Sequence, residues 1–227
     1  MAAGRRAIFG LYSCKPMVNS SINEGVELGS EIKAVIFDLS EVLLHGLLGM
    51  RDDLASKLHV PAETIDFRIS ELNDLFEGRI QEDAYWNSFL RKEGWNIDPL
   101  ELKHMVRANF REIKGTKEII VALRKSGYMV GLFSVHAKEW IHYCEERFKY
   151  RDLFDLMIYS FEIEVCKPER RAFEILVKRI GLSSNQILFI DDAQINIDTA
   201  IGMGIHAILF ESPQQLSKQL KSLGVLK

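Results

Sequence analysis

Five short runs of β-branched and aromatic residues recur along the chain, separated by more polar segments. Short, mainly apolar runs of this kind are typical of strands that are buried on both faces of a sheet. We therefore predict five buried strands, at residues 32–39, 128–134, 156–160, 186–191 and 206–210.

Segments with apolar residues at three- and four-residue spacing lie between and after these runs, and this spacing predicts amphipathic helices. A regular alternation of strand and helix produces a parallel sheet with helices on both faces. We therefore predict an α/β protein with a doubly wound, Rossmann-like parallel sheet. The predicted helices cover residues 117–126, 138–148, 169–180, 195–203 and 213–223.

The interval between the first and second predicted strands is much longer than a single crossover helix requires. Its apolar residues keep helical spacing, as in Tyr85, Trp86 and Phe89, which we assign to the interior of a bundle of about four helices. We predict that residues 31–46 and 112–227 form the core domain, and that residues 47–111 form a helical cap inserted over the strand ends.

The composition is that of a globular protein, with 47% hydrophobic and 27% charged residues. The net charge is −3, and 29 basic residues are scattered among 32 acidic ones, which argues against a nucleic-acid partner. No apolar run approaches the roughly 20 residues that cross a bilayer, so we expect no membrane partner. Cys14, Cys144 and Cys166 lack metal-ligand spacing and indicate a reducing compartment.

The first segment of the chain has its own character. Residues 1–23 contain Arg5, Arg6 and Lys15 but no acidic residue, and this basic, serine-containing segment weakly resembles an organellar transit peptide. We interpret residues 1–30 as a disordered N-terminal extension. We expect a cytoplasmic protein, with organellar import as the alternative.

Polar residues gather where the predicted strands end, which is the edge at which open parallel sheets bind ligands. Asp38 follows the first strand, and Asp191 and Asp192 follow the fourth. Two like charges about 4 Å apart repel by about 4 kcal/mol at an effective dielectric constant of about 20, so three carboxylates in one crevice call for a cation. Oxygen ligands open to solvent favour Mg²⁺.

Two further strand ends carry groups suited to an anion. Ser134 ends the second strand and precedes a helix, where its hydroxyl can donate beside free backbone amides. Lys167 adds a positive charge on the turn before Pro168, which we place at the first position of the next helix. Ser134 and Lys167 together predict a cradle for a trianion.

These residues fall in four segments, FDLSEVLL, LFS, CKPERRAF and FIDDAQINIDTAIGMG. In this order the segments resemble the four motifs of the haloacid dehalogenase-like superfamily, over residues 32–210. The chain looks similar to the amino-terminal phosphatase of soluble epoxide hydrolase and to bacterial sugar-phosphate phosphatases, whose helical cap has a stretch similar to FEGRIQEDAYW. The resemblance implies a hydrolase that removes phosphate from a small phosphorylated metabolite with Mg²⁺ as cofactor.

The resemblance also implies a role for each acidic residue. Asp38 would attack phosphorus and become an aspartyl phosphate. The Asp38 carboxylate, the Ser40 carbonyl and Asp192 would bind Mg²⁺, with Asp191 in support. Hydrolysis is then split into two displacements that depend on positioning and charge compensation.

By the same resemblance, Ser134 and Lys167 would hold the transferring phosphoryl group, and Asn196 would brace the metal loop. Two positions depart from the family pattern. Ser40 stands where most family phosphatases have an aspartate that acts as general acid and base, and Val135 stands where asparagine is frequent. Acid–base assistance is typically worth about 10²- to 10⁴-fold, so Ser40 predicts a slow enzyme.

Three functions are possible. The first is the phosphatase, and the second is an impaired family member that binds a phosphorylated ligand or a protein. The third is a metal-independent carbon–halogen hydrolase, and the DDxxxN segment argues against it. Glu41 and His136 lie beside the altered positions, and we interpret each as a local cap or surface residue. We interpret Cys166 as an inert core thiol. Substrate identity and oligomeric state are not predicted; candidate cap charges are Arg51, Arg68, Arg79 and His104.

Overall fold

The computed structural model describes residues 32–67 and 71–227, so the expectation for residues 1–30 lies outside the described residues. Within these described ranges, five parallel strands form one sheet in the order β3-β2-β1-β4-β5. The predicted parallel α/β sheet is therefore confirmed. The strands are β1 (Ala34–Phe37), β2 (Met129–Ser134), β3 (Leu156–Tyr159), β4 (Ile187–Asp191) and β5 (His206–Leu209).

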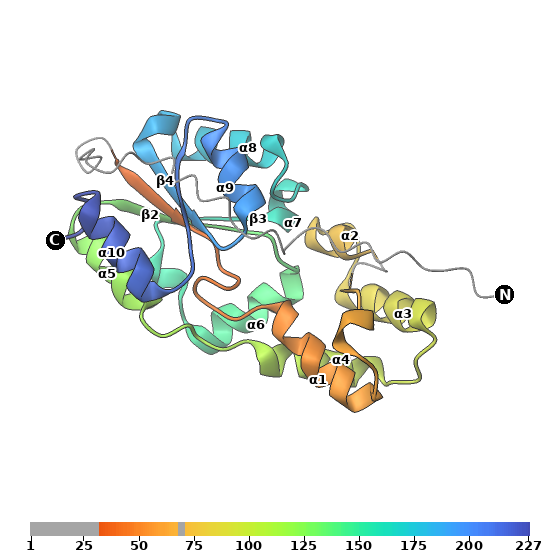
Figure 1. Ribbon diagram of the computed structural model, residues 1–227. Helices are drawn as coiled ribbons and strands as arrows, with labels where there is room; N and C mark the ends of the chain where they lie inside the picture. Colours follow the sequence, from red (N-terminus) through yellow and green to blue (C-terminus); the bar gives the residue numbers. More distant parts are fainter. Residues whose placement is uncertain (1–31, 68–70) are drawn as a thin grey trace.

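Helices cover both faces of the sheet, as a doubly wound topology requires (Figure 1). Strand β1 explains why: Val35 and Phe37 belong to one hydrophobic cluster, whereas Ala34 and Ile36 belong to the other. The first cluster includes residues of α5 (Thr116–Lys125), α6 (Lys138–Phe148) and α10 (Pro213–Ser222). The second includes residues of α7 (Ser160–Ile163), α8 (Arg170–Ile180) and α9 (Gln194–Ile201).

The start of α8 corrects one prediction. Pro168 does not open this helix, because residues 166–169 form a turn in which Glu169 N donates to Cys166 O at 3.0 Å. The Lys167–Pro168 peptide is cis, and the helix begins only at Arg170. The turn lets the Lys167 side chain point towards the sheet, where it donates to a strand carbonyl.

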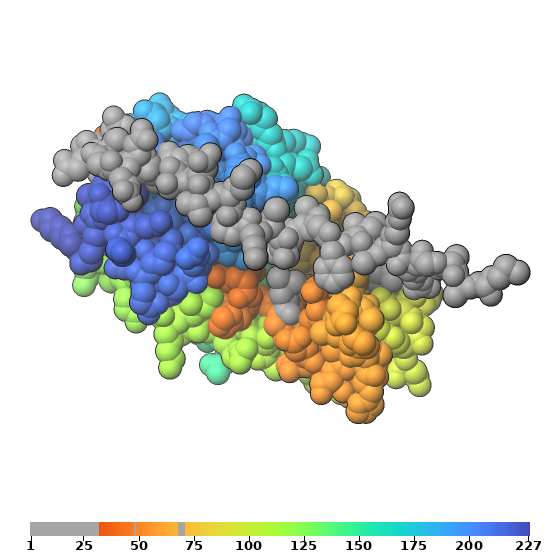
Figure 2. Space-filling view, viewed as in Figure 1, coloured from red at the N-terminus to blue at the C-terminus, as the bar shows by residue number. Residues whose placement is uncertain are grey.

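Among the described residues, four α-helices lie between β1 and α5 and form a second lobe beyond the carboxyl ends of the strands (Figures 1 and 2). We call this lobe the helical insertion and the remainder the sheet lobe. Tyr85, Trp86 and Phe89 are each 0% exposed inside the insertion, as expected for core residues. The helices are α1 (Met50–Leu58), α2 (Leu72–Phe76), α3 (Glu82–Glu93) and α4 (Pro99–Asn109).

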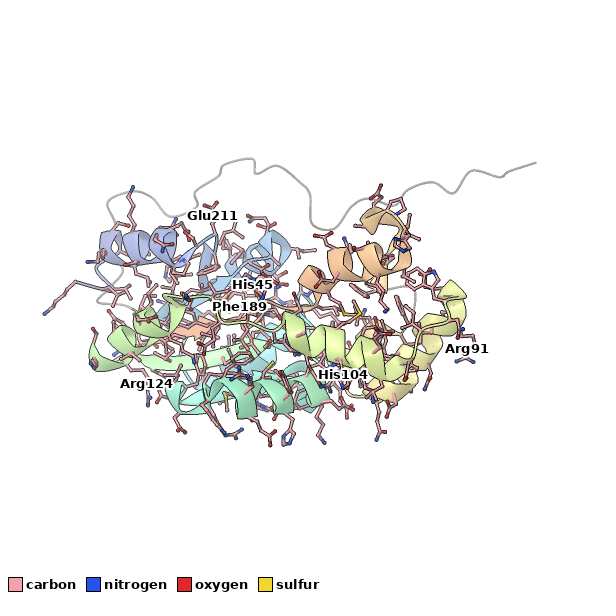
Figure 3. All side chains as sticks on the ribbon, turned by 90° about the horizontal axis from the view of Figure 1, so that it is seen from below. His45, Arg91, His104, Arg124, Phe189 and Glu211 are labelled. Atoms are coloured by element: carbon pink, nitrogen blue, oxygen red, sulfur yellow. The ribbon has the colours of Figure 1, made fainter. Side chains whose placement is uncertain are left out.

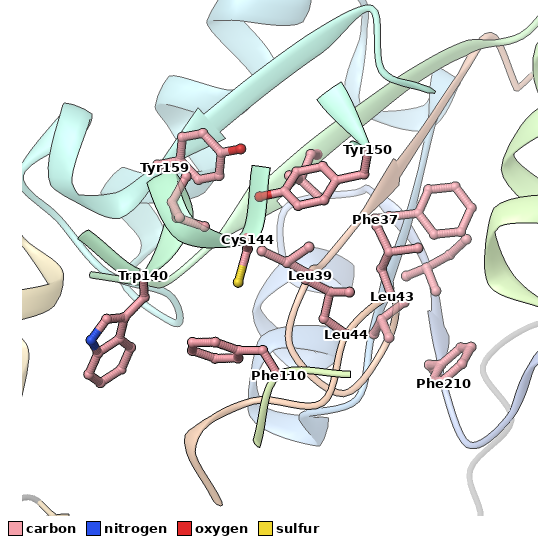
Figure 4. Packing of buried hydrophobic residues seen from close by; sticks show 14 of the residues in the cluster. Phe37, Leu39, Leu43, Leu44, Phe110, Trp140, Cys144, Tyr150, Tyr159 and Phe210 are labelled. Carbon is pink, nitrogen blue, oxygen red and sulfur yellow. The ribbon is translucent and has the colours of Figure 1, made fainter. Parts of the chain in front are cut away.

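The two chain segments that join the lobes run side by side. His45 N donates to Arg111 O and Ile113 N donates to Leu43 O, both at 2.9 Å. One continuous hydrophobic cluster spans both lobes and contains Phe110, which follows α4 (Figure 4). Among the described residues, no helix combines the length and apolar character needed to cross a bilayer.

Candidate active site

The order of the strands brings Asp38 next to the end of β4. Strands β1 and β4 are neighbours, with Phe37 opposite Ile190. Asp38 N continues this ladder by donating to Ile190 O at 2.8 Å. The chain passes from β1 to one side of the sheet and returns to β4 on the other side, so Asp38 lies at the topological switch point, where open α/β sheets bind ligands.

Three carboxylates meet at this point. Asp38, Asp191 and Asp192 each offer an oxygen, and these atoms lie within 4.8 Å of one another. We call these residues the carboxylate cluster. Asp38 is 6% exposed and Asp191 is 0% exposed, whereas Asp192 reaches solvent in part. The sequence prediction that the tips of β1 and β4 lie side by side therefore agrees with the geometry.

Lys167 is buried against this cluster. Its Nζ donates to Asp191 Oδ2 at 2.6 Å and to Phe133 O at 2.9 Å. It also lies 3.0 Å from Asp38 Oδ1, an ion-pair distance with an angle outside hydrogen-bond geometry. Burial opposes the charge, but Asp191 and Asp38 outweigh burial and raise the pKa of Lys167. The lysine is therefore a fixed cation of the site and does not extend into solvent.

Asp191 has little capacity left for a ligand. Its Oδ1 accepts hydrogen bonds from Ala193 N and from Asn196 Nδ2, both at 2.9 Å, while its Oδ2 accepts from Lys167. Asn196, on the first turn of α9, therefore ties Asp191 to the loop that carries Asp192. This arrangement leaves Asp38 and Asp192 as the carboxylates most available to a ligand.

The pKa values of these two carboxyls are raised. Burial raises the pKa of Asp38 to about 6, although Lys167 opposes the shift. Burial also raises the pKa of Asp192 to about 7, with Asp38 and Asp191 adding to the effect. One lysine thus does not compensate three carboxylates. An all-oxygen donor set with uncompensated negative charge fits a hard divalent cation such as Mg²⁺.

Ser134 is a buried polar residue on β2, the strand that pairs with β1. It ends β2 and is 0% exposed, yet its Oγ has no hydrogen-bond partner among the described residues. A buried hydroxyl without a partner costs about 1–3 kcal/mol. The hydroxyl can therefore donate to a ligand oxygen at little further cost.

Glu41 lies beside Ser40 and His136 lies beside Val135, and the structure places them in different environments. Glu41 is a local cap, as expected: it accepts from Gly46 N at 2.7 Å and pairs with His45 Nδ1 at 3.0 Å. The prediction that His136 is a cap or surface residue is wrong. It is 4% exposed, and burial lowers its pKa to about 4, because Phe110 and Trp140 enclose its ring.

Cys166 behaves as an inert thiol. It is buried, and burial is the largest of the effects that raise its pKa to about 12, so it is a poor nucleophile at neutral pH despite its neighbour in sequence, Lys167. The environment of Cys166 therefore does not indicate a reactive thiol.

Of the four cap charges suggested by the sequence, the three that the structure describes have different surroundings. Arg79 pairs with acidic residues of the insertion, and Arg68 lies outside the described residues. Figure 3 shows His104 on α4 and Arg91 at the outer end of the insertion, and both are exposed. The Nε of Arg51 is buried with no hydrogen-bond partner among the residues that the structure describes.

Glu82 is a buried acid that was not predicted from the sequence. Glu82, the first residue of α3, is 3% exposed and is bonded to groups from both lobes. A local signal was present, because Trp86 follows four residues later and places an indole N–H over the carboxylate. The partner from the sheet lobe, Trp140, has no local signal.

The family model described as "Haloacid dehalogenase-like hydrolase" matches residues 58–210. The chain is 33% identical over 73 residues to Acyl-CoA dehydrogenase family member 10 of Mus musculus, which is 32% of this chain and 7% of that protein. It is 24% identical over 149 residues to Flavin mononucleotide hydrolase 1 of Arabidopsis thaliana, a chloroplast protein by its name, covering 66% of this chain and 60% of that protein. The chain thus spans less than two thirds of either relative.

Solved structures show the same fold. A HAD family enzyme of Bacteroides thetaiotaomicron superposes with a TM-score of 0.69 and 21% identity, covering 83% of this chain and 98% of that one. The same enzyme with magnesium and inorganic phosphate gives 0.61 and 20%, covering 80% and 95%. The L-2-haloacid dehalogenase of Xanthobacter autotrophicus, with chloropropionic acid covalently bound, gives 0.60 and 18%, covering 86% and 85%.

Proposed function

The chain belongs to the haloacid dehalogenase-like hydrolase family, and from this premise we propose that it is a Mg²⁺-dependent phosphatase that hydrolyses a small phosphomonoester through an aspartyl phosphate on Asp38. One observation carries the proposal: in the part of the chain that the structure describes, three clustered carboxylates have one buried ammonium, that of Lys167, against them, and the buried Ser134 hydroxyl at the end of β2 has no partner. A divalent cation would supply the positive charge that the carboxylates lack. A phosphoryl oxygen would supply the acceptor that the Ser134 hydroxyl lacks.

In the first displacement, an Asp38 carboxylate oxygen forms a bond to phosphorus as the ester P–O bond breaks, and the leaving alkoxide takes a proton from water. In the second, a water oxygen attacks phosphorus and gives a proton to the hydroxide that the first step leaves. The bond between the Asp38 oxygen and phosphorus breaks, inorganic phosphate is released, and Asp38 is again a free carboxylate. Ser40 has no carboxyl proton to give to the alkoxide, so we expect slow turnover. The turnover rate should be lower by the amount that acid–base assistance typically contributes, about 10²- to 10⁴-fold.

Other residues bind and orient the phosphoryl group. Lys167 Nζ, fixed between Asp38 and Asp191, balances one phosphoryl oxygen, and Ser134 Oγ donates to a second. Asp38, Asp192 and the Ser40 carbonyl would hold Mg²⁺, with Asp191 in support. When bound, Mg²⁺ neutralises the charge on the transferring group.

The relatives support a small phosphorylated substrate. One is named as a flavin mononucleotide hydrolase, and one similar structure contains magnesium with inorganic phosphate. We propose phosphorylated metabolites of the size of a mononucleotide or smaller as the first compounds to assay. Because the flavin mononucleotide hydrolase is a chloroplast protein by its name, imaging of the whole chain fused to a fluorescent protein would decide between cytoplasm and organelle.

The test compares two matched substitutions. Asp38→Asn should abolish hydrolysis of phosphomonoesters, whereas Asp198→Asn, on the exposed side of α9, should hydrolyse them at the parent rate. A chelator should stop the parent enzyme. Activity that survives the chelator on a haloacid would instead favour carbon–halogen hydrolysis.

Ser40 and Val135 motivate a second candidate function, the binding of a phosphorylated ligand without turnover. Inorganic phosphate with Mg²⁺ would then raise the melting temperature of the parent protein, while no phosphomonoester in a sensitive assay would be hydrolysed. Measurable turnover that depends on Asp38 excludes this candidate.

A further inference from the structure

Glu82 is a buried carboxylate to which the catalytic proposal assigns no role. Arg107 donates to it with two nitrogens, at 2.8 and 2.7 Å, and the indole nitrogens of Trp140 and Trp86 donate at 2.7 and 3.2 Å. Burial alone would raise the pKa of Glu82, but these donors overcome burial and lower it. The carboxylate is therefore ionised and fully bonded, which is the condition under which a buried charge is tolerated.

The donors come from both lobes. Arg107 and Trp86 belong to the helical insertion, on α4 and α3, whereas Trp140 belongs to α6 of the sheet lobe. Helix α6 starts four residues after Ser134, the last residue of β2. The bond from Trp140 to Glu82 thus connects the insertion to the element that follows the predicted phosphoryl-binding serine.

Two other contacts cross the same boundary. Glu82 N donates to Glu139 Oε1 at 3.3 Å. Ser160 Oγ donates to Phe76 O at 2.5 Å and accepts from His136 N at 3.1 Å, so one hydroxyl joins α2 to the loop after β2.

Aromatic rings fill the space between these bonds. The Trp140 ring centre lies 6.2 Å from that of Trp86 and 5.9 Å from that of Phe76, both in the insertion. Phe110 packs on the Trp140 ring as well, at 6.2 Å, and Figure 4 shows these two side chains next to each other. Hence α6 forms a buried, aromatic contact with the insertion, with an ionised hydrogen-bonded group at its edge.

We propose that Glu82 is a positioning residue, which through its bond to Trp140 holds the helical insertion closed against α6 and thereby restricts which substrates reach the carboxylate cluster. A charge-assisted hydrogen bond of this kind contributes enough that its loss should raise the population of the opened state about ten- to hundredfold. Only the statement about substrates rests on the proposed phosphatase function. Closure itself is a property of the fold.

Two tryptophans provide a matched pair of variants. Trp140→Phe and Trp86→Phe each keep a buried aromatic ring and each remove one indole N–H donor to Glu82 Oε1. The first bond crosses between lobes, and the second lies within α3. Packing losses are similar in kind for both, so a difference between the variants reports on the connection between the lobes.

The primary readout is hydrogen exchange of the Glu82 amide in the full-length protein, because this N–H is bonded across the boundary. The Asp38 amide, bonded to Ile190 O in the sheet, reports global unfolding. In Trp140→Phe we expect the Glu82 amide to exchange about ten- to hundredfold faster relative to the Asp38 amide. In Trp86→Phe this ratio should stay within about threefold of the parent value. Equal acceleration in both variants, or none in Trp140→Phe, overturns the proposal.

Should Trp140→Phe fail to fold, Glu82→Gln serves as the second variant. It keeps the side-chain volume and one acceptor oxygen but removes the charge that strengthens the Trp140 bond. The Glu82-position amide should then exchange several-fold faster than in the parent protein, and an unchanged rate contradicts closure by this residue.

The kinetic readout concerns selectivity. The quantity to compare is the ratio of kcat/KM for a bulky phosphomonoester to kcat/KM for p-nitrophenyl phosphate. If the insertion restricts access, Trp140→Phe should raise this ratio several-fold, and Trp86→Phe should leave it unchanged. A ratio that is the same in all three proteins overturns the selectivity role. Absence of turnover in the parent protein would refute the phosphatase function while leaving the exchange result as the test of closure.

Discussion

Lys167 Nζ lies 2.6 Å from Asp191 Oδ2, and the two side chains are 2% and 0% exposed. The pair is fixed further by Phe133 O, which accepts from the ammonium, and by Asn196 Nδ2, which donates to the carboxylate. Lys167 and Asp191 therefore form a rigid base for the site. Asp192, at the more open edge, has no comparable cation beside it among the described residues.

Removal of the ammonium should be costly to the fold. In Lys167→Met, Asp191 and Asp38 lose their buried cation, and a broken buried pair typically costs about 3–5 kcal/mol. We expect the free energy of unfolding, measured by urea denaturation at pH 8 without metal, to fall by that amount. Lys178→Met, on the exposed side of α8, is the control and should unfold with the parent. A Lys167→Met protein as stable as the control would show that the pair is not a structural element.

The pH dependence of stability should reveal Asp192. The pKa of Asp192 is raised from its ordinary value of 3.8 to about 7 in the folded protein, so the folded state binds more protons between these values. The free energy of unfolding of the metal-free protein should therefore fall as the pH rises from about 4 to about 7. Asp192→Asn should remove part of this fall and be more stable than the parent at pH 8 by about 1–2 kcal/mol, after allowance for partial exposure.

The effect of Mg²⁺ on stability provides the control for the experiment on pH dependence. Mg²⁺ should raise the melting temperature of the parent at pH 8 and much less so at pH 5, where protons compete for the carboxylates. Asp192→Asn should respond weakly at both pH values, whereas Asp198→Asn should respond like the parent. An equal response of Asp192→Asn and the parent to Mg²⁺ would exclude Asp192 as a ligand.

Ser134→Ala should separate function from stability. The Oγ that it removes is buried without a partner among the described residues, so the variant should be as stable as the parent or more stable by up to about 1 kcal/mol. Its kcat/KM should nevertheless fall about 10²-fold, because one donor to the phosphoryl group is lost. Calorimetry and steady-state kinetics measure the two quantities. A large loss of stability would mean that Ser134 has a structural partner.

Ser40→Asp tests the missing acid–base group. The side chain at position 40 lies beside Gly46, where an added Cβ would come to 3.0 Å from Ser40 Oγ, so residue 46 is kept as glycine in this variant. We expect kcat at saturating Mg²⁺ to rise about tenfold or more. Ser40→Asn has nearly the same shape without the acid and should show no gain. An equal gain in both variants would indicate a steric effect, and no gain in either would favour the ligand-binding function.

Much of the sheet lobe could be predicted from the sequence because its signals are local. Each strand contains a short apolar run, and the parallel order then brings Asp38 beside Asp191. Other features depend on distant contacts. His136 appears polar in the sequence, yet Phe110 and Trp140 bury it. The bond from Trp140 to Glu82 joins residues 58 positions apart, and no periodicity predicts it.

The central claim is that Asp38 becomes phosphorylated during turnover. The most direct measurement is to react the protein with p-nitrophenyl phosphate and Mg²⁺, quench in acid, reduce any acyl phosphate with borohydride and map the modified residue by peptide mass spectrometry. We predict that Asp38 in the parent protein is converted to homoserine, and that the Asp38→Asn protein is not modified. Release of phosphate by the parent with no modification of Asp38, or by Asp38→Asn at the parent rate, would contradict the account.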